Sequence, residues 1–175
     1  MQQILQTHLR PWSTEQILIF LLFVIVGNLW LSFALRTGRI RRRQITSIIL
    51  LEFYMALVYS STVFTRQSMG SHLQLELFAG WKAVFLEHSA EAMTEGVLNI
   101  VLFLPIGWLL VTACRRACRI PQLILYGAAF SLFIEVSQFV FRCGFSSVDD
   151  LLNNTVGCIL GIAAKRLVQG IMDET

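Results

Sequence analysis

The run GVLNIVLFLPIGWLLVTA, from Gly96 to Ala113, decides the fold because it carries no charged residue along its length. At a rise of 1.5 Å per residue, a helix of about 20 apolar residues crosses a bilayer core of about 30 Å. The run is therefore typical of a transmembrane helix, and Pro105 with Gly107 predicts a kink within it.

Further apolar runs lie on both sides of this one. The chain of 175 residues has only 14% charged residues and a mean hydropathy of +0.65, whereas soluble domains carry about 25% charged residues. This length leaves no room for a separate soluble catalytic domain of the usual size. We expect an all-α integral membrane helical bundle of about five transmembrane helices, with the other spans at 17–35, 45–64, 122–141 and 150–168. The first run is too long for a cleaved signal peptide and is followed by arginines, so it should be retained.

Basic residues predict the orientation, because short loops rich in lysine and arginine stay in the cytoplasm. One side of the bundle carries the larger group, which comprises Arg36, Arg39, Arg41, Arg42, Arg43, Arg115, Arg116, Arg119, Lys165 and Arg166. The other side carries only Arg10, Arg66, Lys82 and Arg142. We expect the N-terminus outside and the C-terminus inside. This topology explains the arginine cluster at 36–43, so we expect no nucleic-acid partner.

The outer segment 65–95 is not a span, yet it has apolar residues at helical spacing, namely Leu73, Leu77, Phe78, Trp81, Val84 and Phe85. Two interpretations stay open: an amphipathic helix in the outer interface, with Trp81 at headgroup depth, or a cap packed over the bundle. With two spans before it, this segment forms an N-terminal part, 1–94, that precedes a three-span part, 95–168. Together they form one membrane domain.

Polar residues within spans are costly, so their positions carry information. In the expected topology the outer ends of the last three spans lie at the same depth, and their polar faces converge. A cavity open to the outer leaflet would be lined by Asn99, Glu135, Gln138, Arg142, Asp150 and Asn154. Gly157 and Gly161 form a small-xxx-small pair that allows close helix approach.

The alternative is an internal network, in which Arg142 pairs with Glu135 or Asp150 and the amides hold the helices together. The carboxylates outnumber the single arginine and leave surplus acceptors, which favours a ligand, water or proton. The pairs His72 with Glu76 and His88 with Glu91 lack a further ligand of defined spacing, and the cysteines lack paired spacings. We expect neither a metal nor a cofactor.

Three runs resemble the signature of the VanZ-like family: EGVLNIVLFLPIGWLL at 95–110, SLFIEVSQFVFR at 131–142 and SSVDDLLNNTVGCILG at 146–161. The matching positions are Asn99, Pro105, Gly107, Glu135, Gln138, Arg142, Asp150, Asn154, Gly157 and Gly161. One departure is Ser147, where the family usually carries a further aspartate. The family takes its name from a protein associated with low-level resistance to the glycopeptide teicoplanin. The resemblance thus implies an envelope protein of the bacterial cytoplasmic (inner) membrane, but no settled reaction.

Our leading hypothesis is a non-enzymatic binding protein whose outward polar site engages a lipid-linked envelope precursor or an amphipathic glycopeptide. One alternative is an intramembrane enzyme acting on a lipid headgroup, with Glu135 or Asp150 as general base and Arg142 holding a phosphate. It lacks a nucleophile or metal motif, so no catalytic residue is assigned. Another is a proton-coupled transporter, with Glu135 and Glu52 marking a path, although no inverted repeat supports it. No protein partner is identified.

Overall fold

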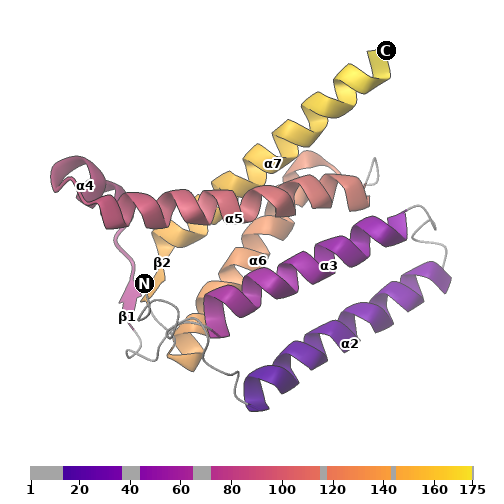
Figure 1. The fold of residues 1–175 in the computed structure, drawn as a ribbon, viewed down its shortest axis with the longest axis horizontal. Helices are drawn as coiled ribbons and strands as arrows, with labels where there is room; N and C mark the ends of the chain where they lie inside the picture. Colours follow the sequence, from indigo (N-terminus) through magenta and orange to yellow (C-terminus); the bar gives the residue numbers. More distant parts are fainter. Residues whose placement is uncertain (1–13, 37–43, 65–71, 115–117, 143–144, 175) are drawn as a thin grey trace, which may run out of the picture.

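The computed structural model describes residues 14–36, 44–64, 72–114, 118–142 and 145–174. It is a bundle of helices with one small sheet at one end (Figure 1). In chain order the elements are α2 (Thr14–Arg36), α3 (Ile45–Tyr59), the π-helical turn η2 (Ser60–Phe64), β1 (His72–Gln74), α4 (Ala79–Leu86), α5 (Ala90–Cys114), α6 (Ile120–Phe141), β2 (Phe145–Ser147) and α7 (Val148–Glu174).

Among the described residues, four helical segments are long and apolar enough to cross a membrane: Ile45–Phe64, Ala90–Cys114, Ile120–Phe141 and Val148–Met172. Each of these four segments contains most of one apolar run that the sequence predicts as a transmembrane helix. The remaining expected span, 17–35, falls on α2 (Thr14–Arg36). The all-α membrane bundle is confirmed, and the side of the membrane on which each terminus lies stays a prediction.

Helices α5 and α7 cross closely and run parallel. A Cβ added at Gly157 would collide with the carbonyl oxygen of Ile100, and one at Gly161 would collide with that of Leu104. From the other side, a Cβ at Gly107 would collide with the carbonyl oxygen of Cys158. The two backbones therefore approach closely over about two turns of α5, from Ile100 to Gly107. Because α5 and α7 run in the same direction, the starts of both helices lie at the same end of the bundle.

Helix α3 lies antiparallel to α5. Gln44, just before α3, donates from Nε2 to the carbonyl oxygen of Ala113 at 2.7 Å. Further along, the Tyr54 hydroxyl donates to the carbonyl oxygen of Leu102 at 3.0 Å. The chain then widens into η2, where hydroxyl groups donate back to carbonyl oxygens of α3, as Thr62 does to that of Val58 at 2.9 Å. Such back-bonding supplies donors to carbonyls that a π-helical turn shifts out of register.

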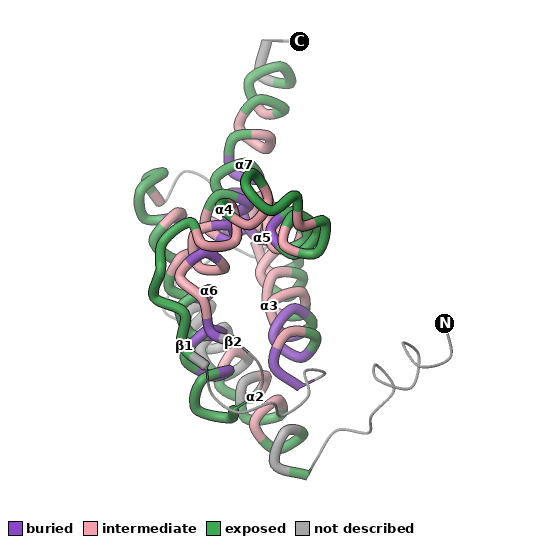
Figure 2. Tube along the Cα trace, turned by 90° about the vertical axis from the view of Figure 1, so that its left-hand side faces the viewer, coloured by how far each residue is buried: buried purple, intermediate pink, exposed green. Residues whose placement is uncertain are grey.

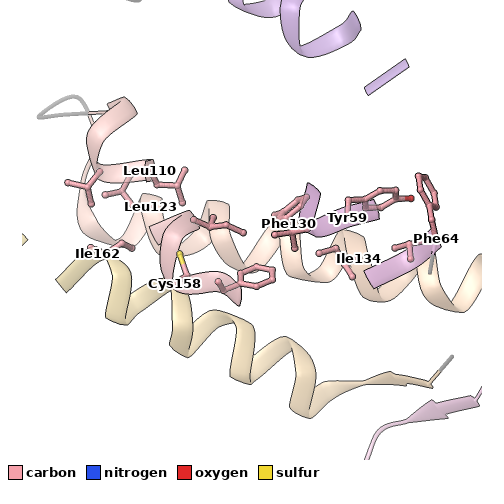
Figure 3. Packing of buried hydrophobic residues seen from close by; sticks show 13 residues of the cluster. Tyr59, Phe64, Leu110, Leu123, Phe130, Ile134, Cys158 and Ile162 are labelled. Carbon is pink, nitrogen blue, oxygen red and sulfur yellow. The ribbon is translucent and has the colours of Figure 1, made fainter. Parts of the chain in front are cut away.

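The apolar core gathers side chains from α3, η2, α5, α6 and α7 (Figure 3). Tyr59 stacks on Phe133 with ring centroids 5.3 Å apart, and Cys158 is a fully buried member of the cluster. The outward faces of the spanning helices are apolar too, with Phe53, Leu125 and Val140 among the most exposed residues. Such faces require lipid around them. The last turns of α7 project beyond the bundle and are largely exposed (Figure 2).

The segment before α5 differs from the single helix that its apolar spacing predicts. Only Ala79–Leu86 is helical, whereas Leu73 lies in β1. This strand pairs in parallel with β2, Leu73 opposite Ser146. Phe78 has a left-handed backbone (φ 61°), which separates the strand from the helix. Strand pairing with a segment some 70 residues away overrides the local helical pattern.

Candidate functional site

A pocket of about 290 Å³ lies at the end of the bundle where β1, α4, α5 and α7 meet. We call it the polar pocket. Its lining combines three carboxylates with amide, indole and small side chains: Gln74, Gly80, Trp81, Ala92, Glu95, Gly96, Ser147, Asp149, Asp150 and Asn153. The first turns of α5 and α7 come together here because the two helices run parallel.

Asp149 builds one wall of the pocket and is itself buried. Its carboxylate accepts the backbone N–H of Phe78 at 2.6 Å and that of Gly80 at 2.8 Å. These are orphan donors at the start of α4, which a carboxylate satisfies well because it also faces the positive end of the helix dipole. Asp149 thus caps α4 from a distant part of the chain, and both of its oxygens are occupied.

Trp81 makes the second link between α4 and α7. Its indole Nε1–H donates to Oδ1 of Asn153 at 3.1 Å. A Cβ at Gly96 would stand 3.3 Å from Nδ2 of the same Asn153, so the glycine leaves room for that amide. The indole is half-buried and stacks on Phe85 with centroids 6.2 Å apart.

Asp150 is the predicted site residue that lines the polar pocket. Nδ2 of Asn99 donates to its Oδ1 at 2.6 Å. This bond joins the first part of α5 to the first turn of α7. Glu95, one helical turn before Asn99, lines the same pocket and is exposed.

Glu135 lies on α6, buried behind the loop that leads into α7. Its Oε2 accepts the N–H of Ser147 at 2.9 Å, and its backbone carbonyl accepts the hydroxyl of Ser146 at 3.1 Å. Ser147 in turn accepts the N–H of Asp149 at 3.1 Å and so caps α7. Serine and aspartate are both good N-cap residues, so capping survives the departure from the family pattern at Ser147. In these contacts Glu135 positions β2, outside the pocket lining.

Gln138 and Asn154 are buried deeper in the bundle. Gln138 donates from Nε2 to the carbonyl oxygen of Thr62 in η2 at 3.2 Å, and Asn154 donates from Nδ2 to the hydroxyl of Ser131 at 2.9 Å. Within the described residues, Oε1 of Gln138 and Oδ1 of Asn154 have no hydrogen-bond partner. These amides hold α6 against η2 and α7, away from the polar pocket.

Arg142 lies at the C-cap of α6 with a left-handed backbone (φ 55°) and an exposed side chain. It is outside the polar pocket, and the contacts of Glu135 described above run to Ser146 and Ser147 instead. The six predicted site residues thus occupy three places: the pocket and its Asn99 partner, the buried network, and the exposed end of α6.

Sequence reasoning assigned no site role to Asp149, Asn153 or Trp81. A signal was present, because Asp149 and Asn153 are four residues apart and share the face of α7 next to that of Asp150. The polar edge of a tryptophan in an apolar segment also indicates a partner. In the described part of the chain, no group of three or more His, Cys, Asp or Glu side chains is placed to hold a metal ion.

The helices and the polar pocket at their end define a multi-pass membrane protein. The family described as VanZ/LLP1 matches residues 18–169, so the chain belongs to this family. Protein VanZ of Enterococcus faecium is 32% identical over 68 residues, which are 39% of this chain and 42% of that relative. The match thus covers less than half of the relative's length. No solved structure matches the chain.

Proposed function

We propose that this chain is a non-enzymatic binding protein of the bacterial cytoplasmic membrane. Its ligand is a lipid-linked envelope component or an amphipathic glycopeptide such as teicoplanin, which the protein engages at the outer face. The observation that carries the proposal is the polar pocket at the end of spanning helices, with Glu95 and Asp150 beside Trp81. Family membership supports a role in the envelope.

The lining favours one kind of ligand chemistry. Ionised carboxylates accept hydrogen bonds and cannot donate them. Glu95 and Asp150 therefore suit hydroxyl, amide and ammonium groups, and they repel phosphate. The half-buried indole of Trp81 adds an apolar surface of the kind that packs against a sugar ring or an aromatic amino acid. The polar part of the ligand is accordingly a sugar or a peptide.

Asp150→Asn tests the proposal because asparagine is nearly isosteric and its Oδ1 can still accept the bond from Asn99. The substitution removes the charge and turns the other carboxylate oxygen from an acceptor into a donor. Hydrogen bonds to charged groups are worth about 1.5–3 kcal/mol, which corresponds to an affinity loss of about ten- to hundredfold. Glu87→Gln is the matched control, since Glu87 is an exposed carboxylate outside the pocket lining.

Two measurements read the result: mass spectrometry of lipids that copurify with each variant, and teicoplanin susceptibility of cells that express it. Asp150→Asn should lose the copurifying species and any protection, and Glu87→Gln should keep both. A folded Asp150→Asn protein that matches the wild type in both measurements would overturn the proposal.

A further inference from the structure

The segment from β1 to the end of α4, residues 72–86, has an unusual surface for a part of the chain that is too short to span a membrane. We call it the β1–α4 arm. Its large apolar side chains are all exposed: Leu73, Leu75, Leu77, Phe78, Phe85 and Leu86. Phe85 is 71% exposed and Leu86 77%. Several large exposed apolar side chains within one short segment indicate a contact with lipid or with another protein.

The arm cannot bury this surface by folding back, because its other side is fixed to the bundle. Asp149 holds the start of α4 through two backbone N–H groups. Trp81 is bonded to Asn153, and β1 is paired with β2. The inner side of the arm forms a wall of the polar pocket through Gln74 and Gly80. The apolar side therefore faces outward as a permanent feature of the fold.

Helix α4 contacts α5, and the outward face of α5 is apolar as well. This face begins with Met93 and runs along the spanning helix through Val97, Leu98 and Val101, all exposed. In a membrane-spanning helix such a face meets acyl chains. Figure 1 shows α4 at the end of α5 where this face begins, so the lipid that covers α5 also reaches the arm.

The charged groups of the arm are compatible with the headgroup region. Lys82 lies between Phe78 and Phe85 along the exposed face and bonds through Nζ to Oε1 of Glu76 at 2.5 Å. That hydrogen bond and the positive charge of Lys82 lower the pKa of Glu76. Lysine side chains at membrane surfaces extend along apolar neighbours and keep the ammonium group at headgroup depth. The arm thus combines an apolar face with a polar edge, as interfacial segments do.

We propose that the β1–α4 arm is seated at the boundary between headgroups and acyl chains of one leaflet, with Phe85 and Leu86 inserted among the chains. The occupant of its apolar face is bilayer lipid. The mouth of the polar pocket then lies at the edge of the leaflet, and a ligand reaches it from the lipid phase. This second step rests on the proposed function, whereas the seating of the arm does not.

Photo-crosslinking tests the seating. The photoreactive amino acid p-benzoylphenylalanine is placed at Phe85, at Leu86 or at Glu87 in the full chain, which is reconstituted in vesicles of phosphatidylethanolamine and phosphatidylglycerol. Glu87 follows Leu86 but is two positions from Phe85 and so points to the opposite side of α4. Leu98 on α5 is the positive control for lipid contact. After illumination, adducts are identified by intact mass.

We expect phospholipid adducts at Phe85, Leu86 and Leu98, and at least fivefold fewer at Glu87. Crosslinked dimers at Phe85 and Leu86 in place of lipid adducts would assign the surface to a second copy and overturn the proposal. Equal lipid labelling at Glu87 and Phe85, or none at both while Leu98 is labelled, would also overturn it. Repeating the labelling with Asp150→Asn separates the two proposals, because lipid adducts at Phe85 should persist whether or not the pocket binds its ligand.

Discussion

The contact between α5 and α7 predicts that a single methyl group at Gly157 destabilises the protein. A Cβ there would collide with the carbonyl oxygen of Ile100 and would stand 2.9 Å from its carbonyl carbon and 3.0 Å from its Cα, whereas ordinary contact begins at 3.4 Å. All three neighbours are backbone atoms, so no side chain can rotate away. Relieving the contact with the carbonyl carbon alone takes about 0.5 Å and the oxygen requires more, and a gap of 0.5–1 Å already forfeits about a quarter to a half of the dispersion energy of each contact.

This dispersion energy is lost at the contact between α5 and α7, which is the most extensive contact between two of the described helices. Overpacking by a methyl group costs about 1–3 kcal/mol, so Gly157→Ala should lower the melting temperature by several degrees at about 2–4 °C per kcal/mol. The matched control is Gly170→Ala in the same helix, because a Cβ at Gly170 meets nothing within 4 Å. Replacing an exposed helical glycine by alanine stabilises by about 0.5–1 kcal/mol.

Thermal unfolding of the purified variants in one detergent, followed by circular dichroism, measures the difference. Gly157→Ala should melt below the wild type and Gly170→Ala at or above it. Equal melting temperatures for the two variants would refute the reasoning, since they would show that α5 and α7 do not approach closely at Gly157.

Three further predictions concern orientation and the polar contacts. An alkaline phosphatase fusion at the C-terminus should be inactive, because the enzyme folds only outside the cytoplasm. An active fusion would show that the C-terminus lies outside, opposite to the expected topology. Glu135→Leu should lower the free energy of unfolding by about 1–3 kcal/mol, because it leaves the N–H of Ser147 without its acceptor. Arg142→Gln, at an exposed position, should change it by no more than about 0.5 kcal/mol in the same unfolding assay. Comparable losses for the two variants would show that Arg142 belongs to the buried polar network of Glu135. Asp149→Ala should release the start of α4, so hydrogen exchange at Phe78 and Gly80 should rise at least tenfold while α6 stays protected; unchanged exchange would show that Asp149 does not hold the arm.

Much of the bundle could be predicted from the sequence because the bilayer imposes a simple length rule. The expected runs 45–64 and 122–141 match α3 with η2 and α6 closely. The pair Gly157 and Gly161 also indicated a close helix contact, although only the structure identifies the carbonyl groups of Ile100 and Leu104 as the surface that they meet. Composition and spacing sufficed for these features since each depends on one segment at a time.

The site was harder to predict because it depends on pairings between distant segments. The converging depths of α5 and α7 could be expected, and Asn99 does bond to Asp150. The set of residues that line the pocket could not be predicted, because it depends on the pairing of β1 with β2 and on the left-handed backbone at Phe78. The role of Glu135 was equally hidden. A carboxylate in a span suggests a ligand, but here it accepts a backbone N–H from the loop before α7.

The capping of α4 by Asp149 has a consequence for the order in which the protein is assembled. The carboxylate lies 71 residues after Phe78 and 69 after Gly80 in the chain. At a synthesis rate of about 5–20 residues per second, the ribosome needs roughly 4–14 s to produce the residue that α4 requires. During that interval the arm emerges without its acceptor or the partner strand β2. The polar pocket therefore cannot be completed before the start of α7 has been synthesised, and a chain truncated before α7 would leave the arm without its anchor.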